Sequence, residues 1–179
     1  CELAVYSSRR VAAMESYMGL VEVGVGLVPG AGGLTYIARR AAENAQASTD
    51  KDLLHFLTDG FTAAAMAKVG MSALDSRKLG YLLWSDVIVP NKDELLYVAI
   101  NEAKAMYRAG YRPPMKRQFA VAGRDGKATI QGQLVNMRDG GFISQHDFYV
   151  SSLIANVLTG GDVDPGTLVD EEYLMTLER

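Results

Sequence analysis

The segment PGAGG, residues 29–33, constrains the fold most, because it directly precedes a stretch of helical periodicity. Apolar residues recur at intervals of three and four over residues 34–41, and a proline with glycines before such a stretch marks a helix start. The first backbone N–H groups of a helix lack partners inside it and can bind an oxygen that carries negative charge. We therefore predict a loop, a helix and an oxygen-binding position near Gly30. A plain strand-to-helix turn would explain the same residues.

Helical patterns predominate along the rest of the chain. The β-branched stretch WSDVIVP, residues 84–90, is the best strand candidate, and residues 9–14 and 16–22 are further candidates for short buried strands. Because helices dominate, the chain cannot supply a whole sheet by itself. The predicted helices are a short one ending near residue 6, one around residues 53–57 with an N-cap at Ser48, Thr49 or Asp50, and others at 62–68, 73–79, 95–106, 128–137 and the acidic C-terminal end.

Composition narrows the functional class. The chain has 179 residues, of which 49% are hydrophobic and 22% charged, as is typical of a globular protein. A net charge of -3 without a block of basic residues argues against nucleic-acid binding. The apolar runs are too short to span a membrane. One cysteine, Cys1, cannot form an internal disulfide, so a cytoplasmic location is expected. Since no methionine precedes Cys1, we expect that the true N-terminus is missing.

Two glutamates, Glu2 and Glu22, lie among apolar residues. A general acid and a general base must both reach one position on a substrate, and apolar surroundings help to raise a carboxyl pKa toward the working pH. Glu22 lies between two valines, with glycines close by, so it is a candidate for this role. Each residue also has a simpler explanation: a solvated glutamate at a strand end for Glu22, and a favourable interaction with a helix dipole for Glu2.

Other reactive side chains carry weaker signals. The two histidines, His55 and His146, lack neighbours at metal-ligand spacing, so no metal site is expected, and His146 with Asp147 suggests a capping or surface pair. Cys1 has no partner that would make it a nucleophile. The arginine pairs at residues 9–10 and 39–40 could approach a coenzyme A phosphate, but such pairs are usually solvated.

The segments CELA and GLVEVGVGLVPGAGG together resemble the enoyl-CoA hydratase/isomerase (crotonase) superfamily. In the resemblance, Glu2 matches the first catalytic glutamate of that family and Glu22 the second. Val21 departs from the pattern, because the family usually has proline there. The glycine-rich motif is matched by Gly26, Pro29, Gly30, Gly32 and Gly33.

The C-terminal part, with AGYRPP, GGFISQHD and PGTLVDEEYLMTLER, resembles long bacterial 3-hydroxyacyl-CoA dehydrogenases that end in a crotonase-like domain. The resemblance implies an α/β fold of the crotonase/ClpP-like class, present here as a mostly helical fragment with a few short strands near the N-terminus. Residues 1–110 would form the C-terminal half of the crotonase-like domain, and residues 111–179 a helical extension.

The resemblance also implies a role in fatty-acid β-oxidation, in which water adds to a 2-enoyl-CoA thioester. Glu2 and Glu22 would hold the water and shuttle the proton, while the N–H group of Gly30 helps to place the water. The oxyanion donors would come from regions outside this chain, so the fragment alone is expected to be inactive. No cofactor is expected in the fragment itself, and NAD belongs to the missing dehydrogenase part.

Two alternative functions also fit these residues. One is enoyl-CoA isomerisation, which generally requires only one of the glutamates. The other is a non-catalytic acyl-CoA binding or assembly module that supports the dehydrogenase. The expected partners are the acyl-CoA substrate and the missing N-terminal part of the polypeptide. Self-association is also expected, because half a domain exposes apolar surface.

Overall fold

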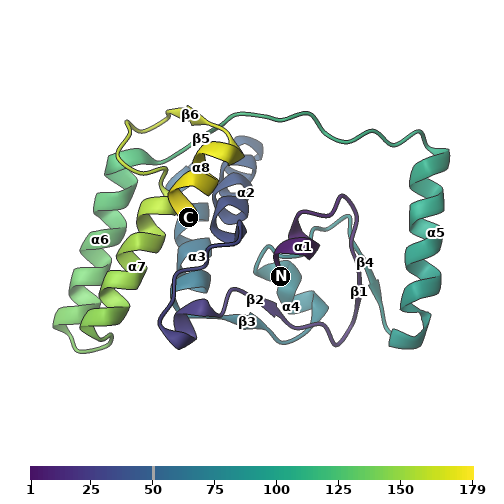
Figure 1. Cartoon of the computed structure of the whole chain (residues 1–179), viewed down its shortest axis with the longest axis horizontal. Coiled ribbons are helices and arrows are strands. Elements are labelled where there is room, and N and C mark those ends of the chain that lie inside the picture. Colours follow the sequence, from purple (N-terminus) through teal and green to yellow (C-terminus); the bar gives the residue numbers. More distant parts are fainter. Residues whose placement is uncertain (50) are drawn as a thin grey trace. The chain divides into compact units, whose positions relative to one another are not determined.

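The computed structural model describes residues 1–49 and 51–179, which form two compact units (Figure 1). The first unit comprises Cys1–Gly19 and Val69–Lys116, and the second comprises Leu20–Lys68 and Arg117–Arg179. Most described residues in regular structure are helical, as the sequence predicted. The crotonase-like fold and the boundary at residue 110 stay predictions.

The first unit contains two pairs of very short strands. Strand β1 pairs with β4 in parallel, with Ala12 opposite Ile88, and β2 pairs with β3 in antiparallel orientation. Ala12, Ala73 and Leu82 form its small buried cluster. The bounds are α1 Glu2–Val5, β1 Val11–Ala13, β2 Met18–Gly19, β3 Val69–Gly70, α4 Ala73–Lys78, β4 Val87–Val89, η2 (a 3-10 helix) Lys92–Glu94 and α5 Leu95–Arg108. The predicted strand around Val87–Val89 is therefore confirmed.

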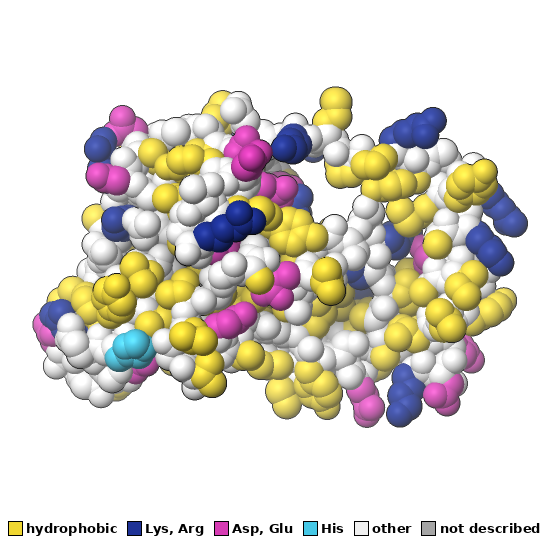
Figure 2. All heavy atoms as spheres, viewed as in Figure 1, with side chains coloured by type: hydrophobic (Ala, Val, Ile, Leu, Met, Phe, Trp, Pro, Cys, Tyr) yellow, Lys and Arg dark blue, Asp and Glu magenta, His cyan; other side chains and the backbone are white. Residues whose placement is uncertain are grey.

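Helix α5 has no buried residue, although it contacts β1. Figure 2 shows apolar side chains interspersed with basic ones along this helix, at the right of the view. Tyr97 is 72% exposed and Tyr107 is 87% exposed. Leu96 and Ile100 are exposed as well. This exposed apolar surface, comprising Leu96, Tyr97, Ile100 and Tyr107, is covered by nothing in the described part of the chain.

The second unit is a helical assembly around α2. This helix contacts α3, α7 and α8, while α6 packs along α7 (Figure 1). Helices α2 and α3 approach closely at Gly60, where an added Cβ would lie 2.3 Å from the side chain of Ile37. The bounds are η1 (a 3-10 helix) Glu22–Val25, α2 Gly33–Ala47, α3 Leu53–Ala65, β5 Phe119–Ala120, α6 Gly123–Asp139, α7 Gln145–Leu158, β6 Leu168–Val169 and α8 Glu171–Glu178.

Helix α3 begins later than the sequence analysis predicted. Its N-cap is Asp52, whose carboxylate accepts a hydrogen bond from the backbone N–H of His55 at 3.2 Å. Ser48 is the C-cap of the preceding helix α2, so it does not begin α3. Asp50 lies outside the described residues. Asp52 fits the role because its side chain reaches the free N–H groups of the first turn.

Candidate functional site

Glu22 begins the 3-10 helix η1 rather than ending a strand. The helix closes through the N–H of Leu27, which donates to the carbonyl of Glu22 at 3.0 Å, and through Gly26, which has a left-handed backbone with φ of 78°. The Oε2 atom of Glu22 is buried and accepts no hydrogen bond from the described residues. A buried carboxylate oxygen without a donor is costly, so a water molecule or a ligand that donates to this atom would stabilise it.

The glycine loop, residues 26–32, ends at the start of α2 as predicted. Gly32 is the N-cap of α2, with a left-handed φ of 98°, and has no side chain to cap the helix. The carboxylate of Glu178, at the end of α8, takes this role. It accepts hydrogen bonds from the N–H groups of Gly32 at 2.9 Å, Leu34 at 3.2 Å and Thr35 at 3.0 Å. The oxygen at this helix start therefore belongs to the chain itself.

Gly30 lies in the middle of the glycine loop and is exposed. Its N–H is not among the donors to Glu178. An added Cβ at Gly30 would lie 3.8 Å from the backbone oxygen of Glu178, which is an ordinary contact distance. The structure thus places Gly30, an exposed residue, beside the capped helix start. Its role in placing a water stays a prediction.

The other end of the glycine loop is held by α7. Nε2 of His146 lies 2.9 Å from the carbonyl oxygen of Gly26, which can only accept, so the imidazole donates. Ser144 and Asp147 form a reciprocal capping box at the start of α7. The hydroxyl of Ser144, and then its backbone N–H, lower the pKa of the Asp147 carboxyl below its ordinary value, with a smaller contribution from the nearby His146. The sequence predicted a capping or surface pair at His146 and Asp147, and the capping box of Asp147 confirms the capping role.

A cleft of about 480 Å³ opens in the second unit beside η1. Its walls come from η1, the end of α3, and helices α6 and α7, and most of the side chains that line it are apolar. A few polar side chains also line it, among them Lys68 and Asp147. The lining residues are Val23, Gly24, Phe61, Thr62, Ala65, Met66, Ala67, Lys68, Gln133, Leu134, Met137, Phe142, Ile143, Asp147 and Ser151.

Glu2 begins helix α1 in the first unit, and its Oε2 lies 3.2 Å from the amino nitrogen of Cys1. Arg10 binds the C-terminal end of this helix. Its Nε donates to the carbonyl of Ala4 at 2.8 Å, and its Nη2 donates to the carbonyl of Val5 at 2.6 Å. Because Glu2 and Glu22 belong to different units, their meeting in one cleft stays a prediction.

The arginine pairs differ from the solvated pairs that the sequence suggested. Arg10 is buried and forms an ion pair with Asp86 at 2.8 Å. Arg39 pairs with Glu171 at 3.0 Å, and Arg40 pairs with Glu43. Arg10 therefore stabilises the fold rather than meeting solvent or a phosphate.

Neither a metal cluster nor a membrane-crossing helix is found among residues 1–49 and 51–179. No group of three or more His, Cys, Asp or Glu side chains there is arranged to hold a metal ion. None of the helices in the same residues is both long enough and apolar enough to cross a membrane.

Comparison with known proteins connects the chain to one named enzyme. The chain matches no protein-family model, and no solved structure matches it. It is 40% identical, over 178 residues, to a protein of Bacillus subtilis (strain 168) named "Probable 3-hydroxyacyl-CoA dehydrogenase". The match covers 99% of this chain but only 22% of that relative. The chain is thus similar to part of a dehydrogenase.

The sequence did not predict two of the carboxylates described above: Glu178, which caps α2, and Asp86, which pairs with Arg10. One signal pointed toward Glu178. Helix α2 starts at glycines, which offer no side-chain acceptor to its first N–H groups, so an acceptor from elsewhere in the chain could take this place. For Asp86 no such signal exists, because 76 residues separate it from Arg10.

Proposed function

We propose that this chain is the hydratase part of a 3-hydroxyacyl-CoA dehydrogenase protein of fatty-acid oxidation. The observation that carries the proposal is the buried Oε2 of Glu22, which has no hydrogen-bond donor among the described residues and lies at the start of a 3-10 helix before a glycine loop. The name of the Bacillus subtilis relative supports an acyl-CoA substrate. The residues that we assign to the chemistry are Glu22, Glu2 and Gly30.

In the proposed reaction, water adds across the double bond of a 2-enoyl-CoA thioester. One carboxylate of the Glu2 and Glu22 pair takes a proton from the water molecule while the water oxygen bonds to C3 of the substrate. The other carboxyl group, which is protonated, delivers a proton to C2. The electron pair of the double bond passes through the enolate of the thioester and ends in the new C2–H bond. Gly30 would hold the water by its N–H group.

The cleft beside η1 is where we place the acyl chain. Its volume of about 480 Å³ lies within the range of about 300–1,000 Å³ that small-molecule sites occupy. Val23 and Gly24 line the cleft and directly follow Glu22 in the chain. An apolar chain bound there would remain close to the proposed acid/base residue.

The test is an assay of the full-length protein that carries this sequence, with crotonyl-CoA as substrate. Glu22→Gln and Glu2→Gln should each lower kcat by about 10²–10⁴-fold, because each replaces a general acid or base by an amide of similar size that cannot exchange the proton. Glu15→Gln is the matched control, since Glu15 is exposed and lies between the two in sequence. It should retain activity.

The same assay separates the alternatives. An isomerase would convert a 3-enoyl-CoA and would tolerate the loss of one glutamate. An assembly module would bind acyl-CoA without turnover in any variant. Either result would refute the proposed hydration. Leaving out NAD keeps the dehydrogenase step from contributing to the signal.

A further inference from the structure

The carboxylate of Glu178 accepts four hydrogen bonds from the start of α2. Oε1 accepts from the N–H groups of Gly32 and Leu34, and Oε2 accepts from the N–H of Thr35 at 3.0 Å and from its hydroxyl at 2.7 Å. An ionised carboxylate offers about four acceptor positions, and all four are used here. The residue is only 7% exposed. Such coordination fixes both partners in one geometry.

No cationic side chain of the described residues pairs with Glu178. The compensation comes from the positive end of the α2 dipole and from charge-assisted hydrogen bonds to its first N–H groups. Replacing the carboxylate by an amide would remove the charge and would point an N–H₂ group at backbone donors. The Glu178 contact is therefore specific to a carboxylate, and Gln should not substitute for it.

The glycine loop that this contact holds connects α2 to Glu22. At one end the carbonyl of Gly26 accepts a hydrogen bond from His146. At the other end Gly32 donates to Glu178. Gly26 and Gly32 both have left-handed backbone conformations, which glycine adopts at low cost. The path from Glu22 to α2 is thus fixed at two points, and Glu178 supplies the second.

We propose that Glu178 is a positioning residue, which holds the glycine loop so that Gly30 and Glu22 keep the geometry that their chemistry needs. The role in catalysis rests on the proposed hydratase function. The holding of the loop does not depend on that function, because it follows from the contacts of Glu178 alone.

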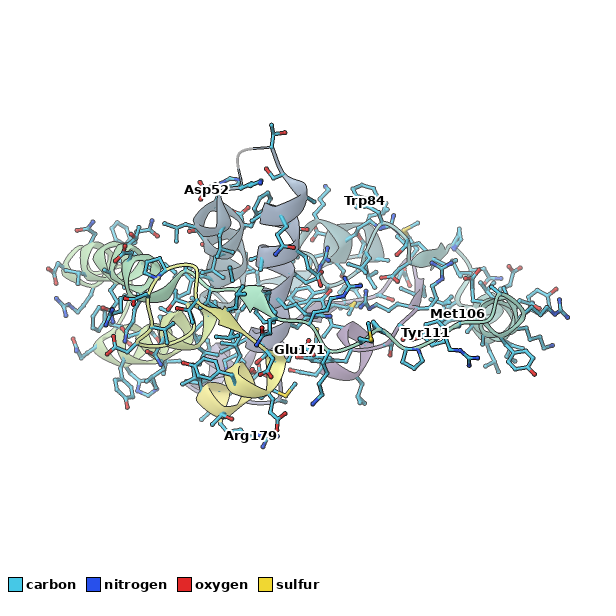
Figure 3. All side chains as sticks on the ribbon, turned by 90° about the horizontal axis from the view of Figure 1, so that it is seen from above. Asp52, Trp84, Met106, Tyr111, Glu171 and Arg179 are labelled. Carbon is cyan, nitrogen blue, oxygen red and sulfur yellow. The ribbon has the colours of Figure 1, made fainter. Side chains whose placement is uncertain are left out.

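Helix α8 offers a matched control at its other end. Figure 3 labels Glu171 and Arg179, which mark the two ends of α8. Glu171 pairs with Arg39 of α2 at 3.0 Å, while Tyr173 donates its hydroxyl to the carbonyl of Gly160 at 3.0 Å. These contacts keep α8 in place when Glu178 is changed. Glu171→Gln removes a charge from the same helix without touching the start of α2.

The experiment compares Glu178→Gln, Glu178→Asp and Glu171→Gln in the full-length protein. Hydrogen exchange is followed in peptides that cover residues 30–37, together with kcat and KM for crotonyl-CoA. In Glu178→Gln we expect exchange of these amides to rise about tenfold or more, and kcat to fall by at least as much while KM changes less than threefold. Glu178→Asp should restore part of kcat, because it keeps the charge. Glu171→Gln should leave exchange of this peptide and kcat near wild type.

The outcomes distinguish the two proposals. Unchanged exchange in Glu178→Gln would show that Glu178 does not hold the loop. Faster exchange with unchanged kcat would reduce Glu178 to a structural cap and would overturn its positioning role. If the wild-type protein does not hydrate crotonyl-CoA, the proposed function fails, and the positioning role in that reaction fails with it. The exchange data would then decide separately whether Glu178 holds the loop.

Discussion

Asp86→Asn should strongly destabilise the first unit, because it breaks the buried ion pair with Arg10. The side chain of Asp86 is 2% exposed, and that of Arg10 is 8% exposed. The Asp86 carboxylate accepts from Nη1 of Arg10 at 2.8 Å and from the N–H of Leu83 at 2.7 Å. The backbone N–H of Arg10 donates to it as well, at 3.2 Å. The carboxylate thus joins β1 to the turn before β4.

The expected loss follows from these contacts. Removing one partner of a buried ion pair costs about 3–5 kcal/mol, since the remaining charge is left uncompensated. In Asp86→Asn the charge is lost and the amide N–H₂ faces a donor in either orientation, at best the backbone N–H of Arg10 alone. Arg10 keeps its bonds to the carbonyls of Ala4 and Val5, which offset part of the loss. We therefore expect about 3 kcal/mol, a large part of the roughly 5–15 kcal/mol that stabilise a domain.

Trp84, labelled in Figure 3, provides the assay, because it is the chain's only tryptophan. It lies two residues before Asp86 in the same loop. The guanidinium of Arg77 lies 5.2 Å from its ring centre and donates to the carbonyls of Leu83 and Asp86. Trp84 is itself 86% exposed, so urea unfolding of the 179-residue chain is followed by the change in its fluorescence as the contact with Arg77 is lost, which reports on this unit.

The control is Glu102→Gln, which breaks the exposed pair with Arg9 in the same unit. It should cost less than about 1 kcal/mol, because water screens such pairs. If Asp86→Asn costs no more than Glu102→Gln, the buried network does not stabilise the unit, and the reasoning is wrong.

Three further predictions concern the second unit and helix α5. The pKa of Asp147 is lowered in the fold. The ionised Asp147 carboxylate therefore contributes fully to the free energy of unfolding above the pKa of an unfolded Asp, about 3.9. This contribution is lost as the pH falls through the pKa in the folded state. Urea midpoints of wild type and Asp147→Asn should therefore converge with acidification, and a constant difference would contradict this. Ala65→Trp in the cleft should lower kcat/KM for long-chain enoyl-CoA roughly tenfold, because the indole would displace about two methylenes of the acyl chain. The kcat/KM for crotonyl-CoA should not change, and the exposed control Ala128→Trp should change neither value. Equal losses for both chain lengths would argue against an acyl site there. The isolated 179-residue chain should self-associate through the apolar surface of α5, and Tyr107→Lys should weaken this in sedimentation, whereas a wild-type monomer would refute it.

Local sequence patterns predicted the helices well, because each helix depends on neighbours in sequence. The glycine-rich start of α2 and the short helix α4 followed by Gly80 are examples. The conformation at Glu22 was harder to predict. Residues 16–22 resemble a buried strand, but only Met18–Gly19 form one, and Glu22 begins a 3-10 helix that ends at Gly26 in a left-handed conformation. A pattern of apolar residues does not reveal where glycine reverses the chain.

The contacts that organise the candidate site could not be predicted in the same way. Arg10 resembled a solvated residue next to Arg9, yet Arg10 is buried against Asp86, whereas Arg9 stays partly exposed with Glu102. Both arginines precede β1, which begins at Val11, in irregular backbone, so two identical neighbours meet different surroundings. The partner of each is fixed only when distant segments pack together.

The Glu178 contact also has a consequence for the order in which the chain folds. Gly32 and Glu178 are 146 residues apart. The first N–H groups of α2 therefore lack the Glu178 carboxylate until the intervening segment has been synthesised. At about 5–20 residues per second, this takes roughly 7–30 seconds during synthesis. Helix α2 can form early, but the loop before it can reach its final geometry only after α8 has docked. A polypeptide that stalls before residue 178 would present the helices of the second unit with the glycine loop still open.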